Sequence, residues 1–275
     1  MKSGILYIVG TPIGNLEDIT LRALRILKSV DLIACEDTRH TQKLLNHYNI
    51  PTPSESYHKF SEKSKCDHFI HILKNGRDIA LVSDSGMPGI SDPGAVLIKE
   101  AIRSSIAVVP IPGPSAFLTA LAVSGFDLER FIYEGFLPHK KMAKKKKLLN
   151  VKDDPGTIVF YESPQRIVET LECIDEVLGN IEIVIARELT KFYEEVMRGK
   201  VRDVLSGVQK TDIKGEIALV IKVEPSKGPE KVDIEKEIKE AMKKLNLTKK
   251  EAIIFVAKRY NLKKKDVYNK TIAKN

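Results

Sequence analysis

The stretch SDSGMPGISDPG, residues 83–94, decides the predicted fold because it directly follows a short and wholly apolar run, residues 79–82. Such a run is typical of a strand that is buried on both faces of a parallel sheet. A second loop of this kind, PIPGPSA at residues 110–116, follows a similar run at residues 107–109. Ligands of parallel sheets bind beyond the carboxyl ends of the strands, so both loops are predicted to line a pocket.

Strands and helices alternate around these loops in the first part of the chain, residues 1–125. A helix is predicted after the first strand, with Asn15 or Asp18 as its cap, and it continues through Leu21, Leu24 and Leu27. The other elements predicted here are strands at residues 6–9 and 31–34 and helices at residues 41–48 and 65–73. This alternation predicts an α/β domain with a mostly parallel sheet.

The pattern changes after Gly125, and residues 126–225 are predicted to form a second α/β domain with a mixed sheet. Its predicted strands cover residues 131–136, 157–161, 181–186, 193–199 and 216–223, and its helices cover residues 165–178 and 201–208. The linker PSKGP at residues 225–229 leads into a tail, residues 226–275, with helices predicted at residues 232–245 and 249–260. The fold class is therefore α/β in two domains, with a small helical appendage that resembles a helix-turn-helix.

The formal net charge of +8 is confined to the tail. Residues 226–275 hold 15 Lys and Arg against 7 Asp and Glu, whereas residues 1–225 hold 30 of each sign. A basic tail on a neutral core is typical of a nucleic-acid contact, and equally of a solvated helical face. A second lysine-rich run at residues 140–147 lies in a loop-like region and favours the first interpretation.

Composition and spacing exclude several classes of protein. No apolar stretch approaches the length of a membrane span, and the first residues lack the order of a signal peptide. Cys35, Cys66 and Cys173 are scattered singly, without metal-ligand spacing, so we expect a cytoplasmic protein with no disulfide and no metal. Gly10 and Gly14 do not have the G-x-G-x-x-G spacing and no G-x-x-x-x-G-K-[ST] occurs, which excludes a plain Rossmann or P-loop site.

Six strings of the chain together resemble the ribosomal RNA small subunit methyltransferase I family. They are VGTPIGNLEDIT (9–20), CEDTR (35–39), SDSGMPGISDPG (83–94), PIPGPSA (110–116), YESP (161–164) and ARELTK (186–191). The resemblance implies the tetrapyrrole methylase fold, in which S-adenosylmethionine lies in a cleft between the two α/β domains of a homodimer. It also implies 2′-O-methylation of a cytidine ribose in the decoding region of 16S ribosomal RNA.

The resemblance assigns contacts with the methyl donor to small and apolar positions, where the backbone can approach a ligand closely. These positions are Ile13, Ser85, Gly86, Met87, Ile90, Ser115 and Ala116, with Glu162 and Leu189 completing the pocket. Other proteins of the fold often have Asp where Met87 stands, so Asp84 is the candidate for a polar contact. Glycine and proline in such loops also serve simply as turn residues, and Ser163 before Pro164 is equally suited to cap a helix.

The sulfonium of the donor already activates its methyl group, so the protein has to align the reactants and manage the proton of a weakly acidic hydroxyl. Charged side chains at strand ends are the candidates for holding that proton or a substrate phosphate. They are Glu36, Asp37 and Arg39 in CEDTR and Arg187, Glu188 and Lys191 in ARELTK. Surface ion pairing is the alternative interpretation for each of them.

Basic residues outside the pocket loops are the candidate RNA contacts. In the tail, Thr248 is predicted to cap a helix with an apolar face that includes Ala252 and Val256, and Leu262 and Val267 predict a further short helix. The candidate phosphate contacts are Lys144, Lys145 and Lys146 in the loop-like run and Lys249, Lys250, Lys258, Arg259, Lys263, Lys264 and Lys265 in the tail. The alternative is a basic, solvated helical bundle without a partner.

Two other functions fit the same fold, because a fold does not fix a function. One is methylation of a corrin or porphyrin precursor, and the other is binding of the donor or of RNA without catalysis. The strings CEDTR, YESP and ARELTK and the basic tail favour RNA over a tetrapyrrole. The intact pocket loops argue against an inactive protein.

Overall fold

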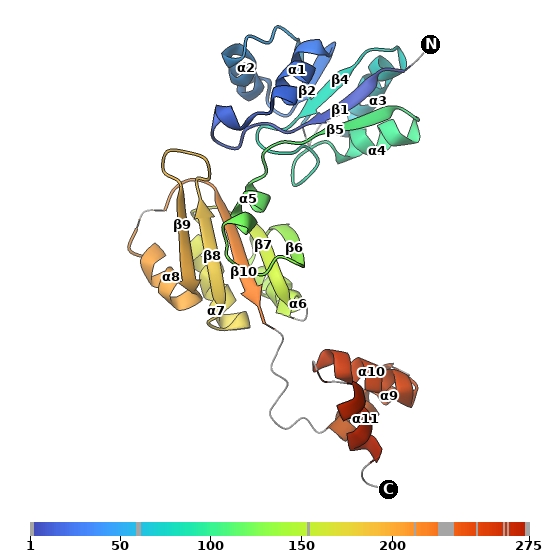
Figure 1. Cartoon of the computed structure of the whole chain (residues 1–275), viewed down its shortest axis with the longest axis vertical. Helices are drawn as coiled ribbons and strands as arrows, with labels where there is room; N and C mark the ends of the chain where they lie inside the picture. The colour runs from blue at the N-terminus through green and yellow to red at the C-terminus, as the bar shows by residue number, and fades with distance from the viewer. Residues whose placement is uncertain are drawn as a thin grey trace. The chain divides into compact units, whose positions relative to one another are not determined.

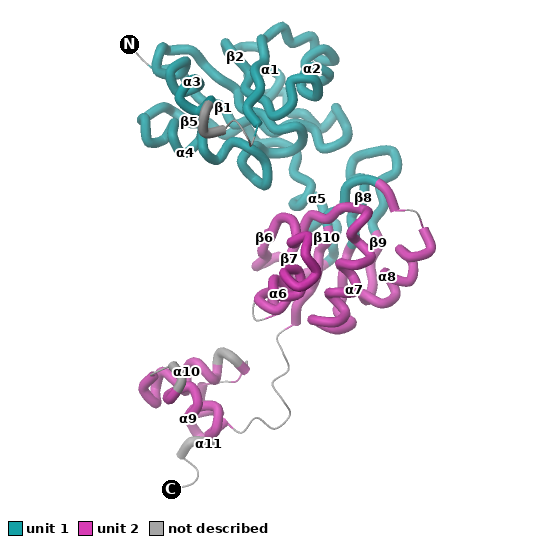
Figure 2. The backbone as a smooth tube through the Cα atoms, turned by 180° about the vertical axis from the view of Figure 1, so that it is seen from behind, with its two compact units in different colours: residues 1–125, 185–196, 215–218 teal, residues 126–184, 197–214, 219–275 magenta. Residues whose placement is uncertain are grey.

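The computed structural model describes residues 3–58, 62–152, 155–211, 213–224, 234–245, 247–260, 262 and 264–272 (Figure 1). The chain divides into two compact units, coloured in Figure 2. The first unit is Met1–Gly125 with Ile185–Val196 and Gly215–Ala218, and the second is Phe126–Val184 with Met197–Lys214 and Leu219–Asn275. The first unit thus includes two segments from beyond the predicted limit at residue 125. Within the described ranges, no helix has the combination of length and apolar character that crossing a membrane requires.

The first unit is built on a five-stranded sheet with the strand order β3-β2-β4-β1-β5. Its strands are β1 Ile5–Val9, β2 Leu32–Cys35, β3 Ser54–Ser56, β4 Ile79–Val82 and β5 Ala107–Ile111. The neighbouring strands are parallel, with Leu6 opposite both Ile79 and Val108. The predicted parallel sheet is confirmed, so the loops after β1, β2, β4 and β5 leave it at the same edge.

Helices cover both faces of this sheet because its central strands are apolar on both sides. Leu6 packs with Phe69 of α3 (Glu62–Lys74) and Leu97 of α4 (Ala95–Arg103) on one face. Val9 packs with Leu27 of α1 (Leu21–Ser29) on the other face, which α2 (Thr38–His47) also covers. Figure 1 shows the two helix pairs flanking the sheet.

Two local predictions for the first unit are wrong. Thr20, and neither Asn15 nor Asp18, caps α1, because its hydroxyl accepts a hydrogen bond from the Ala23 amide (3.1 Å), while Asn15 caps a separate short helix, η1 (Leu16–Asp18). The run at residues 107–109 is not buried on both faces, since β5 is an edge strand and Ala107 is exposed. An edge strand also tolerates Pro110, which has no amide to donate.

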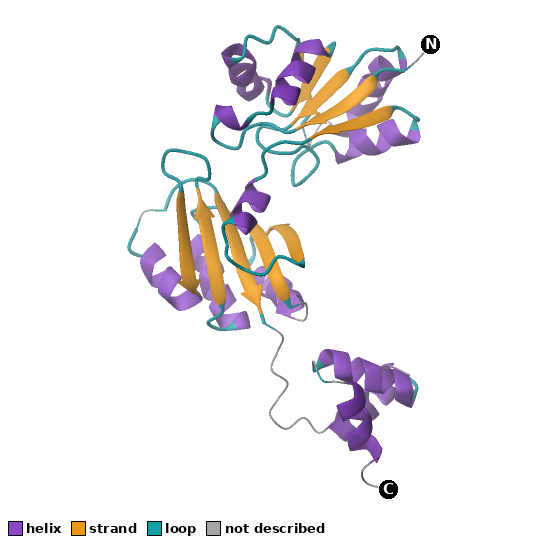
Figure 3. Cartoon of the chain, viewed as in Figure 1, coloured by secondary structure: helices purple, strands orange, loops and turns teal. Residues whose placement is uncertain are grey.

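The second sheet has the strand order β6-β7-β10-β8-β9. Its strands are β6 Phe131–Phe136, β7 Gly156–Glu162, β8 Glu182–Arg187, β9 Glu195–Lys200 and β10 Ile217–Val223. β6 and β7 are parallel, whereas the arrows of β8 and β10 point in opposite directions (Figure 3), so the sheet is mixed, as predicted. The helices α6 (Lys141–Lys152), α7 (Ile167–Leu178) and α8 (Val201–Val208) lie along one face of it (Figures 1 and 2).

The lysine-rich run at residues 140–147 is not a loop, because all but its first residue belongs to α6. Lys144, Leu148 and Val151 are buried at helical spacing, and this face packs toward α7. The neighbouring lysines conceal the pattern, since one of the three buried positions is itself a lysine. An apolar periodicity search therefore finds only two of the three buried positions.

The tail consists of three helices, α9 (Ile234–Leu245), α10 (Lys249–Arg259) and α11 (Lys264–Ile272). They share a small core that includes Ile238, Val256 and Val267. Thr248 caps α10 as predicted: its amide donates to Glu251 Oε2 (2.8 Å), and the Glu251 amide donates back to Thr248 Oγ1 (3.4 Å). Residues 225–233, which include the predicted linker, lie outside the described residues.

Candidate active site

Two of the loops at the carboxyl edge of the first sheet are bonded directly to each other. Thr11, after β1, and Gly86, after β4, exchange two backbone hydrogen bonds of 2.9 and 3.0 Å. The Thr11 hydroxyl donates to the Ser83 carbonyl (3.1 Å), and the Ser83 hydroxyl donates to the Gly86 carbonyl (3.3 Å). Thr11 and Ser83 are buried, so these bonds are shielded from water and fix the geometry of the turn.

The loop after β5 joins the other two through glycine packing. A Cβ placed on Gly10 would lie 2.8 Å from the Gly113 Cα and 2.8 Å from the Met87 sulfur, and a Cβ on Gly113 would lie 2.8 Å from the Gly10 Cα. Only glycine allows the two backbones to approach this closely. The sulfur of Met87 therefore packs against Gly10, and all three loops converge at this point.

Gly86 lies where side-chain and backbone atoms of the other two loops approach the loop after β4. Its backbone has a φ of +76°, which glycine adopts without strain. A Cβ there would meet nothing closer than the Ile13 Cγ2 atom and the Pro114 carbonyl, both at 3.7 Å. Ser115 follows as the first flanking residue of α5 (Ala116–Ala122), and its hydroxyl makes no capping bond to that helix. The structure thus brings together Ile13, Gly86 and the loop that contains Ser115 and Ala116, while Ser85 is exposed beside them.

Three of the predicted donor contacts have other surroundings. Asp84 Oδ1 accepts a hydrogen bond from the Asp37 amide (3.1 Å), which ties the loop after β4 to the loop after β2. Ile90 is exposed and lines an apolar hollow of about 480 Å³ together with Ile98 and Ile102 of α4. Glu162 belongs to the second unit and has a buried carboxylate with partners of its own.

The partners of Glu162 form a buried polar network in the second unit. Its carboxylate accepts from the Thr170 hydroxyl (2.7 Å) and the Ser163 amide (2.8 Å), and it is ion-paired with Arg166 Nε at 3.2 Å. Lys144 Nζ joins this network by donating to Thr170 Oγ1 (3.0 Å). These bonds account for Glu162 structurally, without a ligand.

The string ARELTK belongs to the first unit, where its residues 189–191 pack on Gly14. A Cβ on Gly14 would clash with Lys191 Cγ and would lie 3.0 Å from the Leu189 carbonyl. Glu188 and Thr190 have positive φ angles of 50° and 66°, which are unusual for residues with a side chain. The hydroxyl of Thr190 is buried and has no hydrogen-bond partner among the described residues. Strained and unsatisfied positions of this kind cluster at functional sites.

An ion-pair network fixes this segment and the protonation states of its side chains. Lys191 Nζ donates to Glu188 Oε1 (2.8 Å) and to Glu216 Oε2 (3.0 Å). Burial lowers the pKa of Lys191, but its bonds to Glu188 and Glu216 outweigh this effect and the pKa is raised. The same bond to Lys191 lowers the pKa of Glu188. Lys191 is therefore held as a cation and Glu188 as an anion, so Lys191 is suited to a phosphate and neither takes up a proton readily.

Two carboxyl groups, one in the loop after β2 and one in the loop after β4, have raised pKa values, in contrast to Glu188. Burial raises the pKa of Glu36, and the negative charge of Asp84 raises it further. Burial likewise raises the pKa of Asp92 to about 6, with contributions from Glu36, Asp84 and Glu216. Sequence reasoning missed Asp92, although its position in the S-D-P-G end of the long pocket loop was a usable signal. No three His, Cys, Asp or Glu side chains in the described part of the chain are arranged to hold a metal ion.

Asp37 and Arg39 pair with each other at the start of α2. The Asp37 carboxylate accepts from the Arg39 amide (2.8 Å) and from its guanidinium at Nε (3.1 Å) and Nη2 (2.7 Å). These bonds hold the pKa of Asp37 far below its usual range. Asp37 acts as the helix cap of α2, while the exposed Arg39 guanidinium remains accessible to a phosphate. Arg187 is paired in turn with Glu195 (2.9 Å).

The predicted RNA contacts divide into buried, exposed and undescribed residues. Lys144 is fully buried and its Nζ donates to Glu169 Oε1 (2.8 Å), so the prediction that it contacts RNA does not fit its position. Lys145 is paired with Glu176, and Lys146 is exposed. Of the predicted contacts in the tail, Lys249, Lys250, Lys264 and Lys265 are exposed. The side chains of Lys258 and Arg259, and the whole of Lys263, lie outside the described residues.

Comparison with known proteins identifies the class. Residues 5–205 match the family described as tetrapyrrole (corrin/porphyrin) methylases, and the chain belongs to that family. Among its relatives are proteins named ribosomal RNA small subunit methyltransferase I. The one from Halalkalibacterium halodurans is 46% identical over 97% of this chain and 94% of its own length, and the one from Bacillus subtilis is 46% identical over 97% and 93%. The one from Thermotoga maritima is 49% identical and covers 98% of its own length but 79% of this chain.

Solved structures agree on the fold. A cobalt-precorrin-4 methyltransferase superposes with a TM-score of 0.60 at 16% sequence identity, over 79% of this chain and 94% of its own. A uroporphyrin-III-C-methyltransferase from Thermus thermophilus has a TM-score of 0.55 at 19% identity, over 80% and 94%. A diphthine synthase has a TM-score of 0.62 at 13% identity, over 80% and 90%. The predicted tetrapyrrole methylase fold is confirmed, and at these identities the likeness extends to the fold alone.

Proposed function

We propose that the protein transfers the methyl group of S-adenosylmethionine to ribosomal RNA of the small ribosomal subunit, at the ribose 2′-hydroxyl of a cytidine in the decoding region of 16S RNA. The observation that carries this proposal is the convergence of the loops after β1, β4 and β5 around Gly86. Family membership and the shared name of relatives that align with nearly the whole chain support the reaction and the substrate. With this substrate, we expect the protein to act in the cytoplasm.

The chemistry of the residues around Gly86 suits a nucleoside-like donor. The atoms nearest to Gly86 belong to the apolar side chain of Ile13 and the carbonyl of Pro114. Ser85 beside it is exposed, and the hydroxyl of Ser115, next to Pro114, makes no capping bond to α5. An apolar wall with a few backbone and hydroxyl groups is the usual composition of a small-molecule site. When bound, the donor supplies an already activated methyl group, and the task of the loops is to hold that group in line with the attacking oxygen.

Removal of the 2′-hydroxyl proton is assigned to Glu36, with Asp92 as its neighbour. A general base works best when its pKa lies near the working pH, and both carboxyl groups have raised pKa values. Asp37 and Glu188 are held as anions by strong partners and are weaker bases. Arg39 and Lys191 are cations, so we assign them to substrate phosphates.

The donor site is tested by a pair of tryptophan substitutions in the same helix. Ala116, the first residue of α5, is half-buried beside the loops, whereas Ala122 at the other end of α5 is exposed. We expect Ala116→Trp to weaken S-adenosylmethionine binding about tenfold or more, because the larger side chain clashes with the donor. Calorimetry measures this affinity. Ala122→Trp is expected to bind the donor normally. Equal donor affinity in both folded variants would remove the loops from the donor site.

We also propose that the enzyme is a homodimer, and the apolar hollow on the first unit is the candidate contact. Ile90, Ile98 and Ile102 line it, and Ile102 is 61% exposed. A second copy is the occupant that an isologous contact requires. Light scattering at micromolar concentration is expected to give twice the mass of one chain. Ile102→Lys is expected to lower that mass toward one chain, whereas Leu21→Lys, at an exposed position of α1, leaves it unchanged.

A further inference from the structure

The tail contains a groove between the first turns of α10 and α11. Its volume is about 640 Å³, which is within the usual range for a ligand pocket. Two large side chains on it are partly uncovered: Ile254 is 38% exposed and Tyr268 is 53% exposed. The residues that line it are Lys249, Lys250, Ile253 and Ile254 from α10 and Lys264, Lys265 and Tyr268 from α11.

The same arrangement of side chains occurs on both helices. Each helix begins with two consecutive lysines, and an apolar or aromatic residue follows one turn later, in KKEAII at residues 249–254 and KKDVY at residues 264–268. Residues four apart share a helix face, so the lysines and the apolar side chains border the groove together. The acidic residue in the first of these strings, Glu251, is used by Thr248, whose hydroxyl donates to Glu251 Oε2 (2.6 Å). Neither Glu251 nor Asp266, the acidic residue of the second string, lines the groove, so all the charged side chains that line it are cations.

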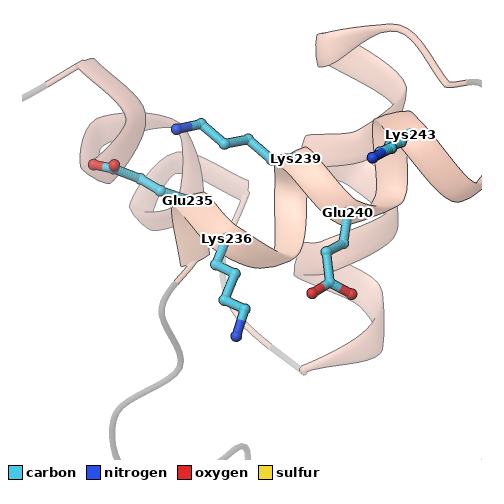
Figure 4. A pocket seen from close by; sticks show the side chains of 5 residues that line it. All are labelled: Glu235, Lys236, Lys239, Glu240 and Lys243. Atoms are coloured by element: carbon cyan, nitrogen blue, oxygen red, sulfur yellow. The ribbon is translucent and has the colours of Figure 1, made fainter.

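A second hollow in the tail, on α9, has a different character. It is lined by Glu235, Lys236, Lys239, Glu240 and Lys243, which carry charges of both signs on one helix. Figure 4 shows these five side chains fanning out from α9, with Lys236 and Glu240 pointing the same way. Mixed charges at this spacing are typical of a solvated helix surface. Lysines line both hollows and therefore do not distinguish them. The α10/α11 groove differs from the α9 hollow because it combines four cations with an apolar floor and an aromatic ring.

We propose that the α10/α11 groove binds an unpaired RNA nucleotide, with its base stacked on Tyr268 and its flanking phosphates held by the lysine pairs of α10 and α11. The proposal rests on the proposed function, which supplies RNA as the substrate. Sequence-tolerant binding of single-stranded RNA combines a cationic groove with an aromatic ring on which a base stacks. A base inside a duplex is already stacked and cannot reach the ring, so the groove selects unpaired over paired RNA.

The groove is expected to act on substrate affinity and not on the reaction itself. The relative from Thermotoga maritima aligns over 98% of its own length but leaves about a fifth of this chain unmatched. That share is close to the size of the tail, residues 226–275. Because the residues that line the groove are not among the candidate catalytic residues, loss of the groove is expected to raise KM for RNA and to leave kcat at saturating substrate nearly unchanged.

The test measures binding of the full chain to a fluorescently labelled single-stranded oligouridine and to an RNA duplex of equal length, by anisotropy. Tyr268→Ala is expected to weaken single-strand binding at least about fivefold and duplex binding little, while Tyr268→Phe retains the affinity. Lys264→Gln with Lys265→Gln is expected to reduce the slope of log affinity against log salt by about 1.4. The control is Lys239→Gln with Lys243→Gln, which removes the same charge from the mixed α9 surface and is expected to change the slope by less than half as much.

A second variant reports stacking directly. The chain contains no tryptophan, so Tyr268→Trp places the only tryptophan of the variant in the groove. Its emission is expected to be quenched saturably by oligouridine and not by the duplex, whereas Lys239→Trp on α9 responds to neither. The proposal is overturned if Tyr268→Ala weakens both RNAs equally, if the emission of the Tyr268→Trp variant does not respond, or if polyglutamate competes with RNA at equal charge. Methyl transfer to small ribosomal subunits by the wild-type chain is measured in parallel, and its failure would contradict the proposed function instead.

Discussion

Gly10 and Gly113 lie back to back because two loops have to approach within backbone contact at the edge of the first sheet. The 2.8 Å separation between an added Cβ on one and the Cα on the other leaves no room for any side chain. At the same edge, Glu36 and Asp92 are carboxyl groups crowded by burial and by like charges. Tight packing at the glycines and crowding of like charges at the carboxyl groups both raise the free energy of the folded protein at this edge. A binding site offsets such costs when its ligand is present.

Substitution of either glycine by alanine is expected to destabilise the protein. Gly113→Ala introduces a methyl group against backbone atoms that cannot rotate away, and overpacking of this kind costs about 1–3 kcal/mol. The matched control is Gly207→Ala in α8, where a Cβ meets nothing within 4 Å. That change is expected to stabilise the helix by about 0.5–1 kcal/mol. Calorimetric unfolding of both variants checks the prediction, and a shift of the same sign in both would contradict it.

Asp92→Asn is expected to stabilise the protein at neutral pH but not in acid. The pKa of Asp92 rises from its ordinary value of 3.8 to about 6 on folding, so the folded state binds the proton more tightly. That contribution to stability is fully present below about pH 4 and is lost as the pH rises through 6. The variant should therefore match the wild type near pH 4 and exceed it by ~1 kcal/mol above pH 7, after allowance for solvent screening of a half-exposed group. Thermal unfolding at the two pH values measures this, and a pH-independent difference would argue against it.

At the scale of elements, the sequence predicted most of the fold but not α6. The central strands, most helices and the three converging loops follow from apolar runs and turn residues, because those patterns depend on local spacing. α6 was missed because a buried lysine stands on its apolar face, and the edge position of β5 was missed because strand order depends on contacts distant in sequence. Asp92 became a candidate only when the fold placed it near Glu36.

Lys144→Ala is expected to destabilise α6 against α7. The substitution removes a fully buried side chain whose ammonium bonds to Glu169 Oε1 and Thr170 Oγ1, and it leaves Thr170 with one partner fewer. Because Glu169 is partly exposed, the loss is expected near ~2 kcal/mol, below that of a wholly buried pair. Lys146→Ala, on the exposed face of the same helix, is the control and is expected to change the unfolding midpoint little. Equal midpoints for the two variants would show that Lys144 is not part of the core.

At the scale of the whole molecule, a nearly neutral pair of α/β units is joined to a strongly basic tail. This distribution separates two tasks, because the candidate donor site lies in the first unit and the α10/α11 groove lies in the tail. Charge attracts RNA through its phosphates whatever the sequence, whereas the reaction depends on the geometry of a few loops.

Deletion of residues 226–275 is therefore expected to leave S-adenosylmethionine binding nearly intact and to weaken RNA binding. The slope of log affinity against log salt should fall by about 0.7 to 0.9 for each phosphate that the tail no longer neutralises. Titrations of full-length and truncated protein at several salt concentrations provide the measurement, and donor binding shows that the truncated core is folded. An unchanged affinity and slope would assign RNA binding to the core, with the exposed Lys146 of α6 among the candidates.

The most direct test of the proposed reaction is a map of ribose methylation on 16S ribosomal RNA from cells that lack this protein. We predict that one cytidine in the decoding region loses its 2′-O-methyl group while the other modified positions keep theirs. Incubation of those small subunits with purified protein and S-adenosylmethionine should restore the group, and the Ala116→Trp variant should restore it far more slowly than Ala122→Trp. A methylation map identical to that of wild-type cells, or restoration at equal rates by the two variants, would contradict the proposed reaction and its donor site.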